Sequence, residues 1–337
     1  MLTELAIDAE GLRKVYGGNR ALDGFDLRFA QGTVCGLLGP NGAGKTTAVR
    51  VLTTLARLDR GRAVVAGHDV ATAPTRVRER IGLVGQNAAV DEVLNARQNL
   101  VMFGRLFHLG ARDAERRADE LLEQFDLSDV GDTSVKTFSG GMRRRLDLAA
   151  SLLLRPEVLF LDEPTTGLDP RGRNEVWAAV RSLVGMGTTV LLTTQYLDEA
   201  DQLADRIAVM ESGRVIVEGT AAELKTEAGG DRLEVVVRNA ADLAEARSLV
   251  GDEGGGHASV RIDTRTVTAP ISDRVAALAA TLARLDERQI RIDDIAVRRP
   301  TLDDVFLQVT GHHVPEDEET AMAEQAMTSE QNGEVPA

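Results

Sequence analysis

Three short, strongly apolar runs bounded by turn residues mark buried strands in the first two thirds of the chain. They are Thr33–Leu38, Val158–Leu161 and Thr189–Thr193. A continuous apolar run of this length is typical of a strand that is covered on both faces of a sheet. Each run is followed by a stretch with helical spacing, namely Lys45–Arg57, Arg171–Leu183 and Tyr196–Ala204. Strands that alternate with helices predict an α/β fold, with helices packed on the faces of a parallel sheet.

The alternation is interrupted between residues 91 and 140. Arg97–His108 and Ala111–Phe125 both have the spacing of amphipathic helices, with no strand between them. This pattern predicts a helical insert in the α/β core. The first of the two helices carries an apolar stripe made of Val101, Met102, Leu106 and Phe107. We favour the insert's own core as the interpretation of this stripe, with a docking face for a partner helix as the alternative.

A linker-like segment at Glu227–Asp231 separates a second, smaller region. The strand and helix patterns that follow have the order βαββαβ, which predicts a split-βαβ accessory domain of the α+β class. Their ranges are 233–238, 241–250, 260–262, 267–269, 272–285 and 290–297, with a final helix at 302–310. In that last helix, Val305 and Phe306 are candidates for a contact face, and core packing is the alternative. We therefore expect one domain over residues 1–228 and another over 229–314.

Composition narrows the class of protein. The 337 residues include 39 Lys and Arg against 53 Asp and Glu, a net charge of −14 that argues against nucleic-acid binding. The single Cys35 excludes an intrachain disulfide and a cysteine metal cluster. No apolar run or leader pattern predicts a membrane span or secretion, so we expect a soluble, cytoplasmic protein. The acidic segment 315–337 is predicted to be a disordered tail.

The segment Gly39–Thr46 fits the phosphate-loop pattern G-x-x-x-x-G-K-[ST] between a predicted strand and a predicted helix. Glycines allow backbone N–H groups to surround phosphate oxygens, and the helix N-terminus favours the anion. Lys45 would reach the β- and γ-phosphates, and the Thr46 hydroxyl would ligate Mg²⁺. The residues expected to bind ATP here are Gly39, Asn41, Gly42, Gly44, Lys45, Thr46 and Thr47.

Two acids, Asp162 and Glu163, follow the apolar run Val158–Leu161. They stand at the carboxyl end of a predicted strand, where ligands bind in sheets of this type. Asp162 would hold Mg²⁺ through water, and Glu163 would orient and polarise the water that attacks the phosphate. Acid pairs at strand ends are often merely solvated, but the phosphate loop upstream favours the catalytic interpretation.

The segment Phe138–Met142 has the sequence Phe-Ser-Gly-Gly-Met and leads into a predicted helix. It resembles the signature motif of the ABC-type ATPases. Ser139, Gly140 and Gly141 would bind a γ-phosphate through the hydroxyl, backbone N–H groups and the helix dipole. A serine N-cap followed by a glycine turn is the alternative. The position of this segment ahead of Asp162 favours the signature motif.

The chain is thus similar to ABC-type ATPases over residues 4–225, which implies a P-loop ABC ATPase core. The resemblance implies that Tyr16 stacks on adenine, although a lone Tyr is more often packed. It implies that Gln86 contacts Mg²⁺ and the attacking water and senses the transporter, and that Asp169 crosses to a second subunit. The usual switch histidine is Gln195 here. Its amide can hydrogen-bond a γ-phosphate but cannot shuttle a proton, which bears on turnover rate.

Three segments resemble the daunorubicin/doxorubicin resistance ATP-binding proteins: Phe138–Ala150, Thr193–Ala200 and Leu302–Leu307. Proteins of that subfamily also carry Gln at the switch position and end in a similar helix. The resemblance implies an ATPase that works with a separate multi-span permease. It also implies export of antibiotics or other amphipathic compounds, with the ATPase held at the cytoplasmic face of the cell membrane.

The expected assembly is a head-to-tail homodimer. Each ATP would lie between Gly39–Thr47 of one subunit and Ser139–Met142 of the other. Three alternatives remain open. The cargo could be a lipid, polysaccharide or peptide, the chain could be a non-transport ABC ATPase, or it could be a nucleotide-binding regulator that barely hydrolyses ATP.

Overall fold

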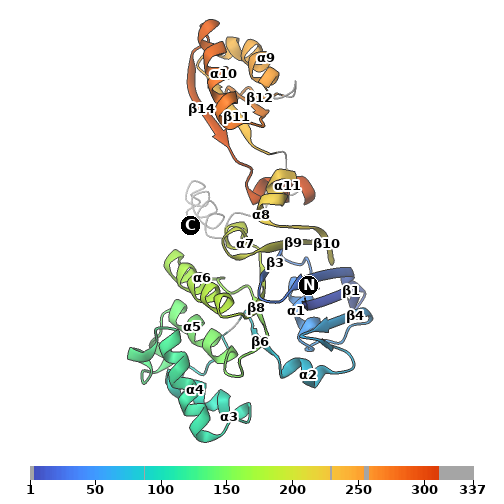
Figure 1. Cartoon of the computed structure of the whole chain (residues 1–337), viewed down its shortest axis with the longest axis vertical. Coiled ribbons are helices and arrows are strands. Elements are labelled where there is room, and N and C mark those ends of the chain that lie inside the picture. Colours follow the sequence, from blue (N-terminus) through green and yellow to red (C-terminus); the bar gives the residue numbers. More distant parts are fainter. Residues whose placement is uncertain (1–3, 87, 228–229, 254–257, 311–337) are drawn as a thin grey trace, which may run out of the picture. The chain divides into compact units, whose positions relative to one another are not determined.

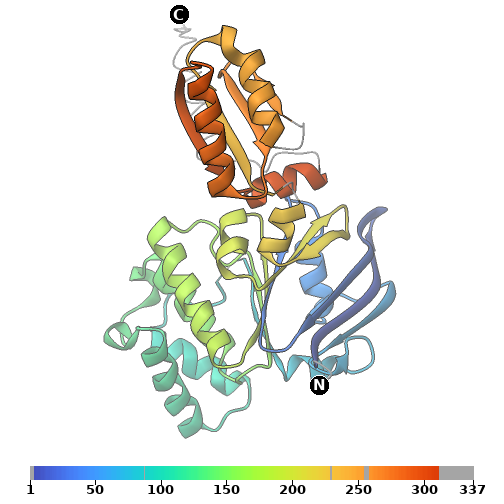
Figure 2. The ribbon, with the colours of Figure 1, turned by 45° about the horizontal axis from the view of Figure 1, so that its top comes forward.

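The computed structural model describes residues 4–86, 88–227, 230–253 and 258–310. The chain divides into two compact units, the first ending at Leu224 and the second beginning at Lys225. Figures 1 and 2 show the ribbon of both units, which are described here one at a time. The acidic segment 315–337, for which the sequence predicts disorder, lies outside the described residues.

A six-stranded sheet forms the centre of the first unit, with the order β10-β9-β3-β8-β7-β6. Five of the strands run parallel, and β10 is antiparallel to β9 at one edge. Every residue of β3, β7 and β8 is buried, as their continuous apolar runs predict. The predicted α/β core is therefore confirmed. The bounds are β3 (Val34–Leu38), β6 (Ile81–Val84), β7 (Val158–Asp162), β8 (Thr189–Thr194), β9 (Arg206–Glu211) and β10 (Arg214–Gly219).

The helix that follows the phosphate loop, α1, is shorter than predicted and ends at Leu52 instead of Arg57. The Thr53 hydroxyl donates to the Val49 carbonyl at 2.8 Å, and Thr54 adopts a left-handed φ of 64°. A non-glycine residue in that conformation cannot continue a right-handed helix, so the chain turns there. The helices at the sheet are α1 (Lys45–Leu52), α2 (Pro74–Arg78), α6 (Pro170–Gly185) and α7 (Leu197–Leu203), with α8 (Ala221–Glu227) after β10.

A second, antiparallel sheet in this unit was not predicted. It has the order β2-β1-β4-β5. Its two long strands alternate between buried and exposed positions, and they lack the continuous apolar run that marks the central strands. Gly17 and Gly18, both with positive φ, turn β1 into β2 without an intervening helix. The bounds are β1 (Leu5–Tyr16), β2 (Asn19–Ala30), β4 (Arg60–Val65) and β5 (His68–Asp69).

The two helices predicted for the insert are present as α3 (Ala96–Leu106) and α4 (Ala111–Gln124), and both ends lie within two residues of the predicted ones. Asn95 begins α3 with a reciprocal capping box to Gln98, which satisfies two otherwise free N–H groups. Two 3-10 turns, Ser128–Val130 and Val135–Thr137, lead from α4 to α5 (Gly140–Ser151). These helices share one apolar core with the central sheet.

The favoured interpretation of the apolar stripe on α3 is wrong for two of its residues. Leu106 and Phe107 are 62% and 45% exposed, so they do not form the core of the insert. The helix instead buries the face that carries Ala96, Leu100 and Gly104, spaced four residues apart. The stripe lies on a neighbouring face of the helix, and of its members only Val101 packs partly against this core.

The second unit has the predicted βαββαβ order, and its sheet has the antiparallel order β12-β13-β11-β14. One apolar core lies between this sheet and the helices α9 and α10. Val305 and Phe306 on α11 are buried, at 3% and 2% exposure, which favours packing within the chain over a free contact face. The bounds are β11 (Arg232–Val237), α9 (Leu243–Glu253), β12 (Ser259–Arg261), β13 (Thr266–Pro270), α10 (Arg274–Glu287), β14 (Ile292–Arg298) and α11 (Leu302–Thr310).

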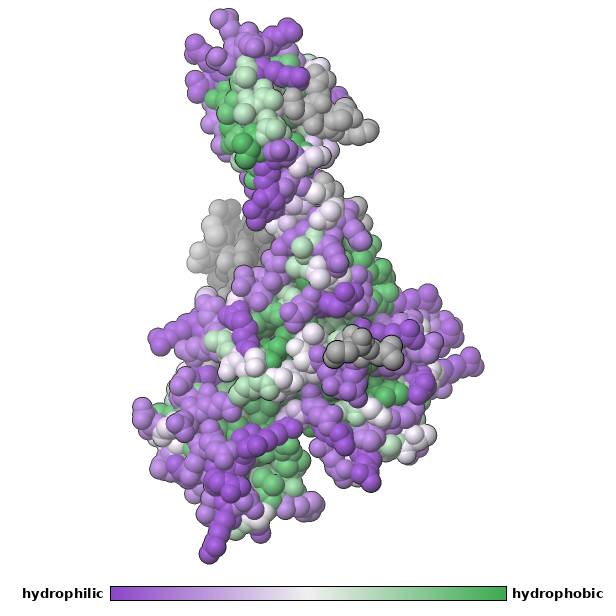
Figure 3. All heavy atoms as spheres, viewed as in Figure 1, coloured by the Kyte–Doolittle hydropathy of each residue, from purple (hydrophilic) through white to green (hydrophobic). Residues whose placement is uncertain are grey.

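Hydrophilic side chains cover most of the face drawn in Figure 3, and apolar side chains form separate patches among them. Within the described ranges, no helix combines the length and the apolar composition that a bilayer crossing requires.

Candidate functional site

The phosphate loop connects the buried strand β3 to α1, and two of its glycines are required by close backbone contacts. A Cβ atom on Gly39 would lie 2.4 Å from the Met210 carbonyl oxygen, and one on Gly44 would lie 2.3 Å from that of Ala21. Gly44 also has a φ of 105° and stands at the N-cap of α1, where no side chain caps the helix. The first N–H groups of α1 are therefore left for a ligand, as an anion site requires.

Lys45, the first residue of α1, is 4% exposed and folds back over the loop. Its Nζ donates to the carbonyls of Gly39 at 2.7 Å and Pro40 at 3.1 Å, and it lies 3.5 Å from Glu163 Oε1. Burial lowers the pKa of the Lys45 ammonium, while the negative charges of Glu163 and Asp162 act to raise it. Phosphate oxygens can recruit such a buried cation, because its bonds to an anion are stronger than those to neutral carbonyls.

Asp162 ends β7 and is 5% exposed. One of its oxygens accepts hydrogen bonds from the Thr46 hydroxyl at 3.3 Å and from the Thr193 hydroxyl at 2.6 Å. Thr46 comes from α1 and Thr193 from the neighbouring strand β8, so three elements meet at this carboxylate. The hydroxyl of Thr46 beside the carboxylate of Asp162 is an oxygen donor set of the kind that Mg²⁺ prefers.

Glu163 stands just beyond β7 with a left-handed φ of 50°. Its N–H donates to the Thr193 hydroxyl and carbonyl, each at 3.1 Å, which holds the residue in this strained conformation. The side chain is 11% exposed and lies at the phosphate loop through its ion pair with Lys45. Backbone strain of this kind is typical of functional sites, because the surrounding structure has to enforce it.

The other predicted residues, Gln86, Gln195 and Tyr16, stand at the ends of three strands of the first unit. Gln86 is exposed and follows β6, and Gln195 is half-buried and follows β8. The Gly39 N–H donates to the Thr194 carbonyl at 3.3 Å, which keeps the residue before Gln195 against the phosphate loop. Tyr16 ends β1 with 46% exposure, and Lys14 Nζ lies over its ring, 5.1 Å from the centroid.

The signature segment forms the start of α5. Ser139 is exposed and caps this helix, and it accepts a hydrogen bond from the Met142 N–H at 3.2 Å. Ser139 and Lys45 stand at the starts of two different helices, α5 and α1. Asp169 caps α6 by accepting from the Gly172 N–H at 2.8 Å. A local capping role for this carboxylate was not predicted.

Three buried polar residues near this centre were not assigned roles from the sequence, namely Thr193, Arg144 and Asp147. Thr193 bonds both predicted acids, because β8 pairs with β7 in a register that places it beside Asp162. Arg144 donates to the carbonyls of Gly85 and Pro164, at 2.7 and 2.8 Å. The sequence marks Arg144 only as one of three consecutive arginines. In the structure, Arg144 is buried and the other two are half-buried.

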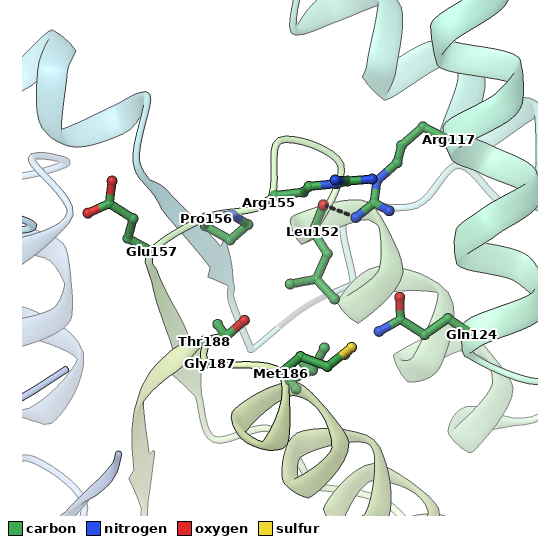
Figure 4. Close-up of a pocket in the computed structure, with 10 residues that line it drawn as sticks. Arg117, Gln124, Leu152, Arg155, Pro156, Glu157, Met186, Gly187 and Thr188 are labelled. Atoms are coloured by element: carbon green, nitrogen blue, oxygen red, sulfur yellow. Dashed lines mark hydrogen bonds between the residues drawn. The ribbon is translucent and has the colours of Figure 1, made fainter. Parts of the chain in front are cut away.

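A separate hollow of about 480 Å³ lies at the opposite edge of the central sheet, where β7 and β8 begin (Figure 4). Arg117 on its wall donates to the Leu152 carbonyl at 2.9 Å, which directs the guanidinium across the opening. Arg155 lies on the same side, and Met186 closes the other side. None of the predicted site residues lines this hollow.

Known proteins share this arrangement over most of the chain. The family model described as ABC transporter matches residues 22–166, and the model described as the C-terminal domain of DrrA1-3-like ATP-binding proteins matches residues 219–310. The daunorubicin resistance ATP-binding protein DrrA3 of Streptomyces coeruleorubidus is 63% identical over 92% of this chain and 97% of its own length. The chain belongs to the ABC transporter ATP-binding proteins, in the daunorubicin resistance subfamily. It is therefore an ABC-type ATPase that binds nucleotide.

Two more distant members of the ABC family match different shares of the chain. The Nod factor export ATP-binding protein I of Sinorhizobium fredii is 38% identical over 93% of this chain and 88% of its own length. The solved structure of CbiO1 from Clostridium perfringens, part of the ABC transporter complex CbiONQ, is 27% identical. It has a TM-score of 0.62 and covers 66% of this chain and 92% of its own length. The predicted P-loop ABC ATPase core is confirmed by this likeness.

Proposed function

We propose that this ABC ATPase drives the export of an antibiotic or a similar amphipathic compound through a separate membrane permease. The observation that carries the proposal is the 63% identity, over nearly the whole of both chains, to a daunorubicin resistance protein. Under this proposal, the cargo path would lie in the permease. The ATPase would be held at the cytoplasmic face of the cell membrane by that permease.

The residues at the carboxyl edge of the sheet fit Mg·ATP. The loop from Gly39 to Thr47 would surround the phosphates, with Lys45 leaving its loop carbonyls to bind phosphate oxygens. Thr46 and Asp162, which already share a hydrogen bond, would hold Mg²⁺ directly and through water, together with Gln86. Bound there, Mg²⁺ supplies charge neutralisation at the phosphate oxygens. Glu163, held in place by Thr193, would then accept a proton from the attacking water.

A head-to-tail pair of subunits would complete the site. Ser139 and Gly140 are exposed at the start of α5, where N–H groups and the helix dipole favour a phosphate. A second copy would be the source of the phosphate loop opposite them. Gln195 would hydrogen-bond the γ-phosphate without titrating.

A groove on the helical insert supports a partner contact. Its volume is about 510 Å³, and it is lined by Arg97, Gln98, Val101, Met102, Glu115 and Asp119. Leu106 and Phe107 add exposed apolar surface at the end of α3. We take this face as the docking site for a cytoplasmic helix of the permease, which would move with the insert when ATP binds. We therefore interpret the apolar stripe on α3 as part of a docking face and no longer as the core of the insert.

Export of a lipid-like or saccharide compound is the second candidate function. It is favoured by the 38% identity to a Nod factor export protein, which shows that the same architecture serves other cargo in a relative. The ATPase site described above is the same under both candidates, so the cargo has to be found by transport measurements.

The test uses inverted membrane vesicles that contain the chain and its permease. ATP-dependent uptake of a fluorescent anthracycline is followed, with Glu163→Gln as the matched inactive variant. We expect uptake in the wild type. In the variant we expect ATP binding without uptake, because loss of a general base slows such a step by about 10²–10⁴-fold. Hydrolysis without uptake would remove the anthracycline but keep the transport ATPase. ATP binding without hydrolysis in the wild type would indicate a regulatory module instead.

A further inference from the structure

The side chain of Arg144 joins two segments that carry the proposed catalytic groups. It lies on α5, one turn beyond the signature segment, and is 6% exposed. Its Nε donates to the Pro164 carbonyl at 2.8 Å, and its Nη1 donates to the Gly85 carbonyl at 2.7 Å. Gly85 directly precedes Gln86, and Pro164 directly follows Glu163. One guanidinium therefore bridges the backbone on either side of the reaction centre.

The same guanidinium reaches further along the turn at the end of β7. Its Nη2 lies 3.4 Å from the Glu163 carbonyl oxygen and 3.5 Å from that of Asp162. This is the turn in which Glu163 holds its left-handed φ of 50°. Donors that bind successive carbonyls oppose relaxation of such a turn, because rotating the peptides would break the bonds.

Asp147 holds the other end of the segment that contains Gln86. It lies one turn along α5 from Arg144, is 5% exposed, and pairs with Nη1 of that residue at 3.4 Å. Its second oxygen accepts from the Ala89 N–H at 3.0 Å. The pair therefore fixes the backbone both before and after Gln86, from a single helix.

Charge compensation alone does not explain this arrangement. A buried ion pair is costly to desolvate, and replacing it by apolar side chains is often neutral or stabilising. Here the guanidinium makes most of its hydrogen bonds to backbone carbonyls, and these carbonyls belong to two separate loops. The planar fork of Arg places its donors on three separated nitrogens, whereas the three donors of a Lys ammonium all radiate from one nitrogen.

We infer that Arg144 and Asp147 are positioning residues that set the distance between Gln86 and Glu163. They would thereby fix the attacking water between the two side chains that contact it. The inference rests on the proposed role of Glu163 and adds two residues to which the sequence motifs give no role. Because both lie on α5, the helix that Ser139 begins, the signature segment and the water site would move as one body.

The first experiment compares Arg144→Lys with Arg117→Lys in the assembled transporter. Arg117 is the matched control, because it is also mostly buried and donates to a backbone carbonyl, Leu152, away from the site. We expect Arg144→Lys to lower kcat about 10²-fold, the effect of small misplacements of reacting groups, with little change in the equilibrium Kd for ATP. Equal kcat in the two variants would overturn the inference.

A double variant separates positioning from charge balance. Arg144→Met with Asp147→Leu removes both charges, so we expect the thermal stability to recover relative to Arg144→Met alone. We expect kcat to stay low, because Gly85, Pro164 and Ala89 have lost their partners. Recovery of kcat together with stability would show that Arg144 only neutralises Asp147, and would contradict the inference.

Amide hydrogen exchange tests the inference separately from the proposed function. In Arg144→Lys, exchange should become faster at Ala89 and at residues 163–166, and it should stay unchanged around the phosphate loop. Unchanged exchange in both segments would overturn the positioning role. Wild-type ATP hydrolysis and anthracycline uptake, measured in the same preparation, test the proposed function independently of this exchange.

Discussion

The two units of the chain differ in the burial of their charged side chains. The first unit buries five of them, at 6% exposure or less: Lys45, Arg144, Asp147, Asp162 and Glu199. In the second unit, the buried polar side chains among the described residues are the neutral Thr266 and Thr281. Its charges pair near the surface instead, as in Arg238–Asp293, whose side chains are 55% and 35% exposed.

This difference shows which part of the chain accepts a loss of stability in order to keep charged groups for catalysis. Burying a charge is unfavourable unless close partners compensate for the lost hydration. In the first unit the buried charges gather at one edge of the central sheet, where β7 and β8 end. Exposed pairs such as those of the second unit contribute about 0–1 kcal/mol each. Substitutions should therefore affect function strongly in the first group and have little effect of any kind in the second.

The largest effect is expected for Lys45→Ala. Removing the ammonium takes away the buried cation that the loop carbonyls and Glu163 hold at the phosphate site. We expect ATP affinity to fall by about 10²-fold or more, since charge-assisted bonds to phosphate are among the strongest in proteins. Equilibrium binding of a fluorescent ATP analogue measures the change. Lys225→Ala, on α8, is the control and should bind as the wild type does. Equal affinity of Lys45→Ala and the control would contradict the assignment.

The site was predictable from the sequence wherever its residues are neighbours in the chain. Gly39–Thr46 and the pair Asp162–Glu163 each carry their pattern in one short segment, so the meeting of Lys45, Thr46 and the two acids follows from the order of strand, loop and helix. Thr193 was missed because its role comes from the pairing of β8 with β7. The catalytic and binding roles themselves stay predictions.

The fold, like the site, was predictable from the sequence in some parts and not in others. Continuous apolar runs marked β3, β7 and β8 correctly, because these strands are covered on both faces. The antiparallel sheet containing β1 and β2 was missed, since its half-exposed strands resemble loops in an apolar count. The exposed end of the α3 stripe was misjudged because this helix buries a different face, the one that carries Ala96, Leu100 and Gly104. The proposed domain boundary at residue 228 falls outside the described ranges and stays a prediction.

An intermediate effect is expected from two threonines at opposite ends of β8. Thr193 donates to Asp162 at 2.6 Å and accepts from the Glu163 N–H, whereas Thr189 accepts from the Gly32 N–H at 2.9 Å, away from the site. Both are buried, and Val has nearly the same shape. Each Thr→Val change should lower the free energy of unfolding by about 1–3 kcal/mol.

Only one of these two substitutions should affect catalysis. We expect Thr193→Val to slow ATP hydrolysis by roughly tenfold, because both Asp162 and the strained Glu163 lose a partner. Thr189→Val should leave hydrolysis unchanged. Steady-state ATPase rates, normalised to the folded fraction, make the comparison. Equal rates in the two variants would show that the hydroxyl of Thr193 serves stability alone.

The smallest effect is expected from a matched pair of Glu→Gln changes, one in each unit. Glu199, on α7, is fully buried and accepts from the Thr165 hydroxyl at 2.9 Å and from the chain's one tryptophan, Trp177, at 3.1 Å. Burial raises the pKa of its carboxyl above the usual 4.5. Glu234, on β11, pairs instead with Arg261 and Arg298, whose side chains are 61% and 70% exposed.

The sign of the pH dependence follows from that shift. Between pH 4.5 and the raised pKa of Glu199, the folded state binds a proton that the unfolded state has lost, so the contribution to stability falls as the pH rises. Glu199→Gln removes this loss. The variant should therefore exceed the wild type in free energy of unfolding at pH 7, and the advantage should shrink toward pH 4.5. Glu234→Gln should change stability by less than about 1 kcal/mol. Urea unfolding measures both changes, followed by Trp177 fluorescence for the first unit and by far-UV circular dichroism for the second. If the advantage of Glu199→Gln did not depend on pH, the buried carboxylate would be ionised and stabilised by its neighbours, and the contrast between the two units would weaken.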